Sequence, residues 1–298
     1  MEEVIVKVED LTIAYHDKPV LKDCDIDIMA GSVTAVIGPN GAGKSTLIKG
    51  ILGLQNKLAG EILIMGEPIK KVQKKIAYIP QTSEVNWDFP TTVMDVVLMG
   101  RYVHLGWFRH PGLEDRKKAE AALGRIGMYD YRDRQISKLS GGQRQRICIA
   151  RALALNPEFV VCDEPVSALD VSIQAQVINL LEDLQEKFNL TYLFISHDLS
   201  VVEHISDTVG VMYLGNIVEF GDTKDLFANP LHPYTKALFS AIPIPDPEAK
   251  MSRIILEGSI PSPANPPSGC KFHTRCKECM EICKTQVPEK KDMGNGHI

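Results

Sequence analysis

The stretch Gly38-Pro-Asn-Gly-Ala-Gly43-Lys44-Ser45 restricts the possible folds of this chain more than any other feature. It fits the pattern G-x-x-x-x-G-K-[ST], and it lies between an apolar strand-like run and a helical pattern. Its glycines allow backbone N–H groups to turn inward around phosphates, and the following helix N-terminus adds positive potential. Lys44 can contact β- and γ-phosphates, and the Ser45 hydroxyl can ligate Mg²⁺. The strand and helix on either side favour a nucleotide site over a chance glycine-rich turn.

The residues predicted to hold the nucleotide phosphates follow one another along the loop. They are Gly38, Pro39, Asn40, Gly41, Ala42, Gly43, Lys44, Ser45 and Thr46.

Strand-like and helix-like segments alternate along the rest of the chain. Apolar or alternating runs predict strands at 3–8, 11–15, 32–37, 61–65, 75–79, 159–162, 191–195 and 208–213. Helical patterns occur at 44–52, 114–126, 139–155, 173–188 and 234–241. This alternation around a phosphate loop predicts an α/β fold with a mainly parallel core sheet. Thr92-Val-Met-Asp95 has capping-box spacing, and we interpret residues 84–150 as a helical insertion.

Charge and hydropathy exclude several classes of protein. The 298 residues carry a net charge of -5, which argues against a nucleic-acid binder that works through bulk positive charge. The longest apolar stretches, such as Val33–Ile37, are far shorter than the roughly 18 residues that span a bilayer. Met1-Glu-Glu-Val lacks the basic and then apolar pattern of a signal peptide. We therefore expect a cytosolic protein that reaches a membrane only through a partner.

A second segment supplies the other half of the predicted phosphate chemistry. Phe159-Val-Val-Cys-Asp163-Glu164 is an apolar strand that ends in two carboxylates. Asp163 is predicted to face the Mg²⁺ site, and Glu164 to orient or deprotonate the attacking water. Alone, an apolar strand that ends in Asp-Glu does not indicate a catalytic site. It does so here because a phosphate loop lies upstream in the same chain.

Leu139-Ser-Gly-Gly-Gln143 precedes Asp163-Glu164, and together with the phosphate loop it resembles the signature of ABC ATPases. The resemblance covers residues 3–225. It implies an ABC-type P-loop ATPase with antiparallel strands beside the mainly parallel core sheet, a helical insertion and a small loop-rich C-terminal extension.

The resemblance also assigns roles to residues outside these segments. Tyr15 matches the aromatic residue that stacks on adenine, and Gln81 matches the Q-loop glutamine that faces Mg²⁺. Asp170 matches the D-loop, and His197 matches the switch histidine. Taken alone, Tyr15 could equally be a packing residue. Gln81 alone would be an ordinary surface residue, and His197 alone would be a structural histidine. Their order and spacing favour the functional interpretation.

The signature implies a dimer. Ser140, Gly141, Gly142 and Gln143 open a predicted helix, whose N–H groups and dipole suit a phosphate. Because each chain already has its own phosphate loop, the signature would bind the γ-phosphate of ATP held by a second ATPase subunit. ATP binding would close this head-to-tail pair. Hydrolysis at Glu164, with His197 and Lys44 contacting the γ-phosphate, would reopen it.

Two resemblances indicate different cargoes. Residues 1–140, with Trp87-Asp-Phe-Pro90 and Asp95–Arg101, are similar to ATPases of manganese and zinc importers. Residues 141–298, with Asp163–Gln176 and Asn229–Leu238, are similar to ATPases of oligopeptide, dipeptide and nickel importers. The cargo is therefore left open between peptides and a divalent metal. The origin of the chain is also left open, between a divergent natural protein and a hybrid. We expect Trp87, Phe89, Trp107 and Phe108 either to anchor a permease or to pack the insertion.

The C-terminal part differs in composition. Ten of the 18 prolines fall at or after residue 230, so we place a boundary between an ATPase domain, 1–229, and an extension, 230–298. Four of the 7 cysteines lie there with the spacing C-x5-C-x2-C-x3-C, at Cys270, Cys276, Cys279 and Cys283. Thiolates at this spacing suit a [4Fe–4S] cluster or Zn²⁺, and free reduced thiols are the alternative. Cys24, Cys148 and Cys162 are predicted to be small core residues.

The resemblance therefore implies an ATPase subunit of an importer. Its partners would be integral membrane permease subunits, a substrate-binding protein and a second ATPase subunit, at the cytoplasmic face of the cell membrane. The alternatives are a soluble ABC ATPase of DNA repair or translation, a phosphate-loop kinase, and a hybrid ATPase without productive coupling. Repair ATPases carry a long coiled coil between phosphate loop and signature, translation factors carry two ATPase units in one chain, and a kinase does not explain Leu139–Gln143.

Overall fold

The structure is a computed structural model that describes residues 3–16, 18–105, 109–167, 169–242, 253–263 and 265–298. Its contacts divide the chain into two compact units whose segments interleave along the sequence. Unit 1 comprises Met1–Ile5, Met29–Ser32 and Ile64–Ile195. Unit 2 comprises Val6–Ile28, Val33–Leu63 and Ser196–Ile298. The boundary predicted after residue 229 falls inside unit 2, because the C-terminal residues pack onto elements of that unit.

Unit 1 contains parallel strands paired in the order β5 (Ile76–Ile79), β6 (Phe159–Asp163) and β7 (Thr191–Ile195). Nearly every residue of β6 and β7 is buried, as expected for apolar parallel strands that are covered on both faces. The sequence predicted all three strands to within one residue at each end.

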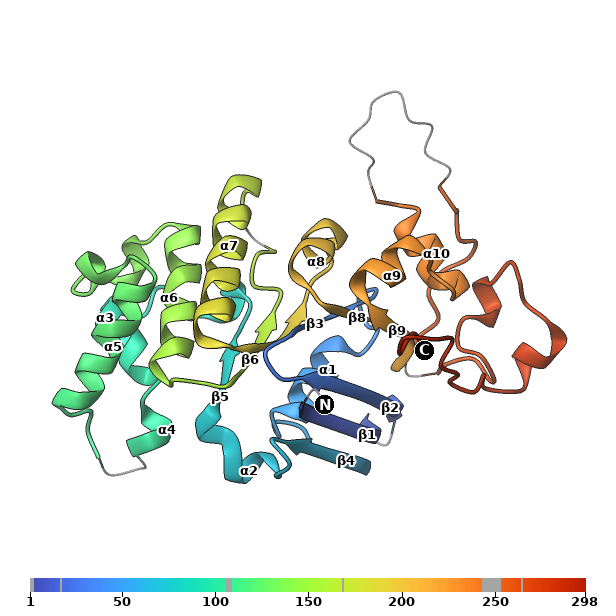
Figure 1. The fold of residues 1–298 in the computed structure, drawn as a ribbon, viewed down its shortest axis with the longest axis horizontal. Coiled ribbons are helices and arrows are strands. Elements are labelled where there is room, and N and C mark those ends of the chain that lie inside the picture. The colour runs from blue at the N-terminus through green and yellow to red at the C-terminus, as the bar shows by residue number, and fades with distance from the viewer. Residues whose placement is uncertain (1–2, 17, 106–108, 168, 243–252, 264) are drawn as a thin grey trace. The chain divides into compact units, whose positions relative to one another are not determined.

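Helices pack against this sheet and against one another. The helices of unit 1 are α2 (Ile69–Val72), α3 (Val93–Met99), α4 (Tyr102–Leu105), α5 (Leu113–Arg125), α6 (Gly141–Ala154) and α7 (Val171–Phe188). Within the predicted insertion, α3, α5 and α6 lie side by side (Figure 1). The capping box predicted at Thr92 is confirmed: the Asp95 N–H donates to Thr92 Oγ1 at 3.2 Å, and the Thr92 N–H donates to Asp95 Oδ2 at 3.1 Å.

Unit 2 contains two groups of strands. β3 (Val33–Ile37) pairs in parallel with β8 (Thr208–Tyr213), and β8 pairs antiparallel with β9 (Asn216–Asp222). A second sheet has the order β2 (Lys18–Met29), β1 (Val4–Tyr15), β4 (Ala59–Ile64). The sequence did not predict β2 and β9, because charged or polar residues interrupt the apolar residues of both strands, which are stabilised by pairing with a neighbouring strand.

The helices of unit 2 are α1 (Lys44–Ile51), α8 (Leu199–Ile205), α9 (Thr223–Ala228) and α10 (Pro233–Phe239). In Figure 1, α8 and α9 lie beside each other, and α9 packs on β8 and β9. Their core includes Ile37 of β3, Tyr213 of β8 and Tyr234 of α10, together with Phe272 from the C-terminal segment. Among the described residues, every helix is too short or too polar to cross a bilayer.

Candidate functional site

The phosphate loop joins β3 to α1 in unit 2. Gly38 has a φ of 150°, and a Cβ atom at this position would lie 2.2 Å from the carbonyl oxygen of Met212, so only glycine fits. The Lys44 ammonium donates to the carbonyl oxygens of Gly38 at 2.7 Å and Pro39 at 3.1 Å, which holds the charge across the loop. The Gly215 N–H donates to the Ala42 carbonyl at 2.7 Å and ties the loop to the β8–β9 turn.

The start of α1 fits a bound phosphate. Gly43, its N-cap, supplies no capping side chain, and no acidic residue lies in the first turn. The N–H groups of such a helix start are available to an anion, and the helix dipole favours negative charge there. Ser45 and Asn40 are exposed beside them, whereas Thr46 is buried. The residues present therefore fit the phosphates of ATP, with the Ser45 hydroxyl as a ligand for Mg²⁺.

Tyr15 and His197 also belong to unit 2. Tyr15 lies at the end of β1 and is 37% exposed, so it is not the core packing residue that the alternative interpretation required. His197 is exposed between the buried Ser196 and Asp198. Asp198 Oδ1 accepts from the Ser200 N–H at 3.0 Å and caps α8, which fixes the backbone next to His197.

In unit 1 the structure brings Gln81, after β5, into contact with Glu164, after β6. Gln81 Nε2 donates to Glu164 Oε2 at 2.7 Å. The Glu164 N–H donates to the Ile195 carbonyl at 3.0 Å, and its φ of 45° is in the left-handed region that non-glycine residues seldom adopt. Such a conformation costs free energy and is found most often at functional sites. The predicted base is therefore held by a specific backbone turn and by the Q-loop glutamine.

Asp163 has a partner that the sequence did not indicate. The Tyr78 hydroxyl on β5 donates to Asp163 Oδ2 at 3.4 Å and also to Glu84 Oε2 at 3.3 Å. Burial, and then the negative charge of Asp163, raise the pKa of Tyr78 and keep its hydroxyl protonated as a donor. Tyr78 directly precedes the Ile-Pro-Gln81 segment, but only the pairing of β5 with β6 places it opposite the carboxylate.

The signature begins α6 of unit 1. Ser140 is its N-cap: the Gln143 N–H donates to Ser140 Oγ at 3.4 Å, and the Ser140 N–H donates to Gln143 Oε1 at 3.0 Å. Ser140 and Gly141 are exposed, and Gly142 is packed so closely that a Cβ atom there would lie 2.6 Å from Ile173. Asp170 is also exposed, at the start of α7. These residues are thus accessible to another molecule.

The tail cysteines do not form a metal site among the residues that the structure describes. Within 253–263 and 265–298 no three His, Cys, Asp or Glu side chains are grouped as ligands. The Cys270 N–H donates to the Cys283 carbonyl at 2.9 Å, so these two residues are neighbours through their backbones. Burial raises the pKa of the Cys270 and Cys276 thiols. A cluster or Zn²⁺ stays a prediction from spacing, whereas the burial predicted for Cys24, Cys148 and Cys162 is confirmed.

The aromatic residues of the insertion have different environments. Trp87 is buried, and its Nε1 donates to the Thr82 carbonyl at 2.7 Å. Of the two alternatives for this residue, packing within the insertion is therefore the one that the structure shows, because the indole finds a backbone acceptor next to the Q-loop. Phe89 is 56% exposed, and Trp107 and Phe108 lie outside the described residues.

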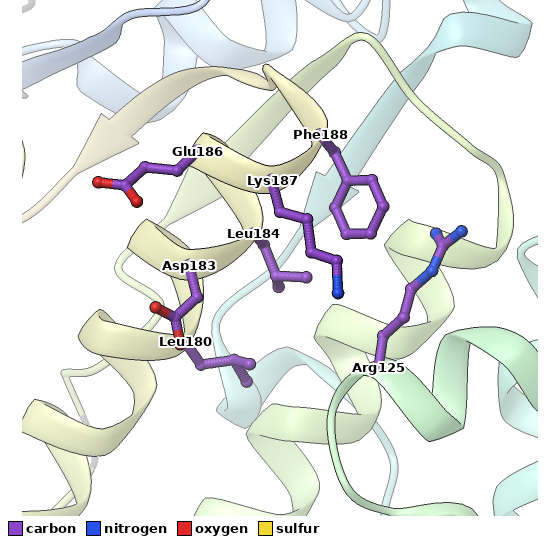
Figure 2. A pocket seen from close by; sticks show the side chains of 7 residues that line it. All are labelled: Arg125, Leu180, Asp183, Leu184, Glu186, Lys187 and Phe188. Atoms are coloured by element: carbon purple, nitrogen blue, oxygen red, sulfur yellow. The ribbon is translucent and has the colours of Figure 1, made fainter.

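Two pockets of unit 1 lie away from the predicted nucleotide residues. One of about 510 Å³ lies at the C-terminal end of α7, where the Arg125 guanidinium lies 4.4 Å from the centroid of the Phe188 ring (Figure 2). The other, of about 640 Å³, lies beside the ends of α4 and α6. Neither pocket contains a residue to which the sequence assigned chemistry.

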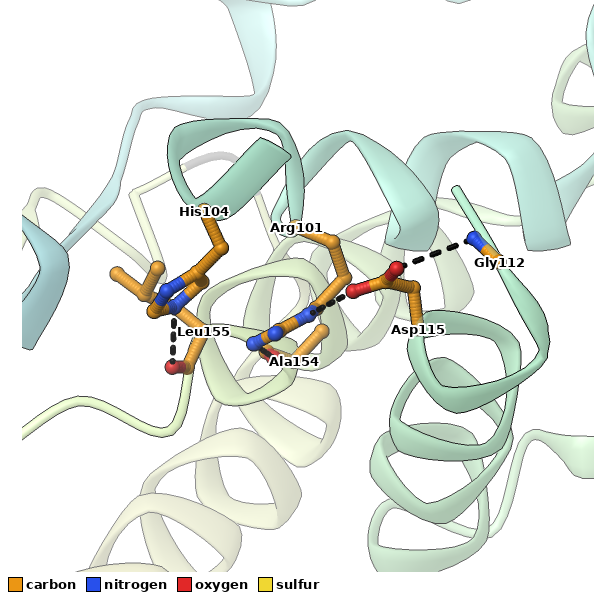
Figure 3. Close-up of polar contacts among 6 residues, drawn as sticks. All are labelled: Arg101, His104, Gly112, Asp115, Ala154 and Leu155. Carbon is orange, nitrogen blue, oxygen red and sulfur yellow. Dashed lines mark hydrogen bonds and ion pairs between the residues drawn. The ribbon is translucent and has the colours of Figure 1, made fainter. Parts of the chain in front are cut away.

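A buried ion pair fastens the insertion helices together (Figure 3). Arg101 Nε lies 3.0 Å from Asp115 Oδ1, and Arg101 Nη1 donates to the Ala154 carbonyl at 3.0 Å. The Gly112 N–H donates to Asp115 Oδ2 at 3.1 Å. This N–H group, followed by Arg101, lowers the pKa of Asp115 below its ordinary value. The contacts join α4, α5 and α6 at one point.

Replacing Asp115 with asparagine should lower the free energy of unfolding at pH 7 by about 1–3 kcal/mol, because Arg101 loses its carboxylate. Since the folded carboxyl has the lower pKa, its contribution is complete above the unfolded value of about 3.9 and is lost as the pH falls below it. The difference between the two proteins should therefore shrink in acid. Urea unfolding at several pH values measures it. An equal loss in Asp133→Asn, whose carboxylate is exposed, would contradict a specific role for the buried pair.

Two family models match the chain. Residues 21–167 match the family described as ABC transporter, and residues 218–283 match the family described as oligopeptide/dipeptide transporter, C-terminal region. The second match includes all four tail cysteines.

The chain is also similar to named proteins and to solved structures. It is 47% identical over 280 residues to the oligopeptide transport ATP-binding protein AppF of Bacillus subtilis, an alignment that covers 90% of this chain and 84% of AppF. It is 45% identical over 288 residues to a putative peptide import ATP-binding protein of Brucella ovis, covering 94% of this chain and 90% of that protein. The solved structure of a putative metal-chelate type ABC transporter in an inward-facing conformation is 32% identical, with a TM-score of 0.70, and covers 82% of this chain and 90% of that one.

The peptide-transport relatives bear on the choice of cargo. Their alignments extend over 90% or more of this chain, so they include both of the segments that resembled different importers. The interpretation of a metal cargo is therefore not supported.

Proposed function

The chain belongs to the ATP-binding subunits of ABC transporters, an ATPase family that binds ATP and Mg²⁺ and acts with membrane permeases, and from this premise we propose that it energises the uptake of oligopeptides or dipeptides. The observation that carries the proposal is the identity to oligopeptide transport ATP-binding proteins along nearly the whole chain. The match of residues 218–283 to the C-terminal region of peptide transporters supports the same cargo.

The proposed ATP site consists of the residues that the family resemblance assigns to it. Tyr15 stacks on adenine, and the loop from Gly38 to Thr46 binds the phosphates through its backbone, with Lys44 on the β- and γ-phosphates. Ser45, Gln81 and Asp163 are the residues that would hold Mg²⁺. Bound there, Mg²⁺ neutralises the charge that develops on the transferred phosphoryl group.

Glu164 is the proposed general base. Its carboxylate accepts a proton from the attacking water, and the contact with Gln81 Nε2 at 2.7 Å orients it. His197 contacts the γ-phosphate. The signature, Ser140 to Gln143, of which Ser140 and Gly141 are exposed, and the exposed Asp170 serve the ATP of a second ATPase subunit, so that the working form is a head-to-tail dimer.

The proposed partners are integral membrane permease subunits and a peptide-binding protein, with the chain attached to the cytoplasmic face of the membrane. We assign residues 1–229 to the ATPase and 230–298 to an extension that resembles that of peptide-importer ATPases. Phe89 supports a docking surface on the insertion, since it is apolar, exposed and close in sequence to the Q-loop. A soluble ATPase that is not coupled to transport, and a hybrid without productive coupling, remain the alternatives.

Replacing Phe89 with serine should reduce recovery of the permease with the ATPase by at least about tenfold, because a docking aromatic at the centre of an interface commonly contributes 2 kcal/mol or more. The measurement is purification from membranes followed by identification of the bound permease. Leu113→Ser is the matched control, since Leu113 is 81% exposed and lies on the same insertion. Recovery of a peptide permease supports the proposal, and recovery of a different class of permease, or of none with the unchanged chain, contradicts it.

A further inference from the structure

The C-terminal segment, residues 253–298, is built into unit 2. Phe272 is 1% exposed and packs in the same core as Ile37, the last residue of β3 before the phosphate loop. Its ring centroid lies 5.3 Å from that of Tyr213 and 5.4 Å from that of Tyr234. The segment thus contributes a large aromatic side chain to the core from which the phosphate loop emerges.

The far end of the segment is attached to β9. The Ile298 N–H donates to the Phe220 carbonyl at 2.8 Å, and the Phe220 N–H donates to the Ile298 carbonyl at 2.9 Å. His297 Nε2 lies 2.8 Å from Glu219 Oε1, and both side chains are at least nine-tenths buried. With Phe272 in the core and Ile298 on β9, residues 265–298 are held at two separate places.

A third part of the segment, Pro263, lies beside the phosphate loop. Gly41 is exposed and has a φ of 79°. A Cβ atom on Gly41 would have one neighbour within 4 Å among the described residues, the Cγ atom of Pro263 at 3.6 Å. The Asn265 N–H donates to the Ser262 carbonyl at 3.0 Å, so Pro263 lies in a turn. The ring of Pro263 therefore lies on the side of the loop toward which a side chain at position 41 would point.

This contact affects the freedom of the loop. Glycine has the largest conformational freedom of any residue, so a glycine-rich loop loses much entropy when it closes on a phosphate. A rigid neighbour that restricts the loop before the ligand arrives lowers that cost and strengthens binding. Proline suits this role, because its ring fixes its own backbone.

We propose that Pro263 is a positioning residue for the phosphate loop, so that the C-terminal segment takes part in nucleotide binding. This inference rests on the proposed binding of ATP at residues 38–46. The extension would then contribute to nucleotide binding by the ATPase, whether or not its cysteines bind a metal.

The test is Pro263→Ala in the full chain. We expect the KM for ATP and the Kd for a fluorescent ATP analogue to rise about fivefold, with kcat changed less than about twofold. Hydrogen exchange of the amides in residues 38–43 should become faster, while exchange in the strands of unit 2 stays the same. Pro288→Ala is the matched control, because Pro288 is an exposed proline of the same segment, and its ATP affinity should not change.

Two outcomes would overturn the inference. Unchanged ATP affinity in Pro263→Ala would mean that the contact does not position the loop. Faster exchange throughout unit 2, with kcat and KM both impaired, would mean that the proline only stabilises the fold. Lys44→Ala separates this test from the underlying function: if that variant binds ATP normally, the proposed ATP site is wrong, whatever Pro263 does.

Discussion

The Glu164→Gln variant should bind ATP and form the ATP-dependent dimer while its turnover falls at least about a hundredfold, the usual effect of losing a general base. Glutamine keeps the size of glutamate and an amide oxygen that can accept from Gln81 Nε2, which in the unchanged chain lies 2.7 Å from Glu164 Oε2. It cannot accept the proton of the attacking water. Steady-state ATPase assays measure turnover, and size-exclusion chromatography with and without ATP measures dimer formation.

A matched carboxylate checks that this effect is local. Glu203 is exposed on α8, and Glu203→Gln should keep the turnover of the unchanged chain. If Glu164→Gln hydrolyses ATP at a near-normal rate, the assignment of the base is wrong. If it fails to bind ATP, Glu164 has a role in binding rather than in the chemical step.

The Phe272→Ala variant should lower the free energy of unfolding by about 3–5 kcal/mol, because truncating a fully buried aromatic side chain loses its burial and leaves a cavity. Phe272 is 1% exposed and packs against Tyr213, Tyr234 and His232. Urea unfolding followed by circular dichroism measures the loss, with unit 2 expected to lose its protection from hydrogen exchange first.

Ile282→Ala is the control for this prediction, since Ile282 is 53% exposed in the same segment and should cost no more than about 0.5 kcal/mol. An unchanged unfolding curve for Phe272→Ala would mean that the C-terminal segment is an appendage that does not stabilise the ATPase. That result would also remove the basis for a role of Pro263.

The parts of the site that could be predicted are those with a local physical cause. The phosphate loop needs glycines, a lysine and a helix start in sequence, so Gly38 to Ser45 was recognisable without any distant contact. The capping box at Thr92 connects residues three positions apart, and it is confirmed. The structure shows a second capping box at Ser140, at the helix start that the sequence predicted. β6 and β7 were predicted from continuous apolar runs, which buried parallel strands require.

Other features depend on residues far apart in the chain. The sequence left Trp87 open between a docking anchor and a packing residue, and only the structure shows that its indole donates to the Thr82 carbonyl and is buried. The contact between Tyr78 and Asp163 exists because β5 pairs with β6, and no local sequence pattern predicts it. Strands β2 and β9 were missed because pairing, rather than their own composition, stabilises them.

The sequence by itself determined the class of this protein: an ATP-binding subunit of an ABC transporter, with the nucleotide residues in a fixed order. Those signals are local, because each phosphate contact is made by a few adjacent residues. Only the tertiary structure decided that Gln81 contacts Glu164, and that the Pro- and Cys-rich segment belongs to the same unit as the phosphate loop. Composition set that segment apart as an extension. The burial of Phe272 against Tyr213 and Tyr234, and the position of Pro263 beside Gly41, come from packing between residues far apart in the chain, which no local pattern encodes.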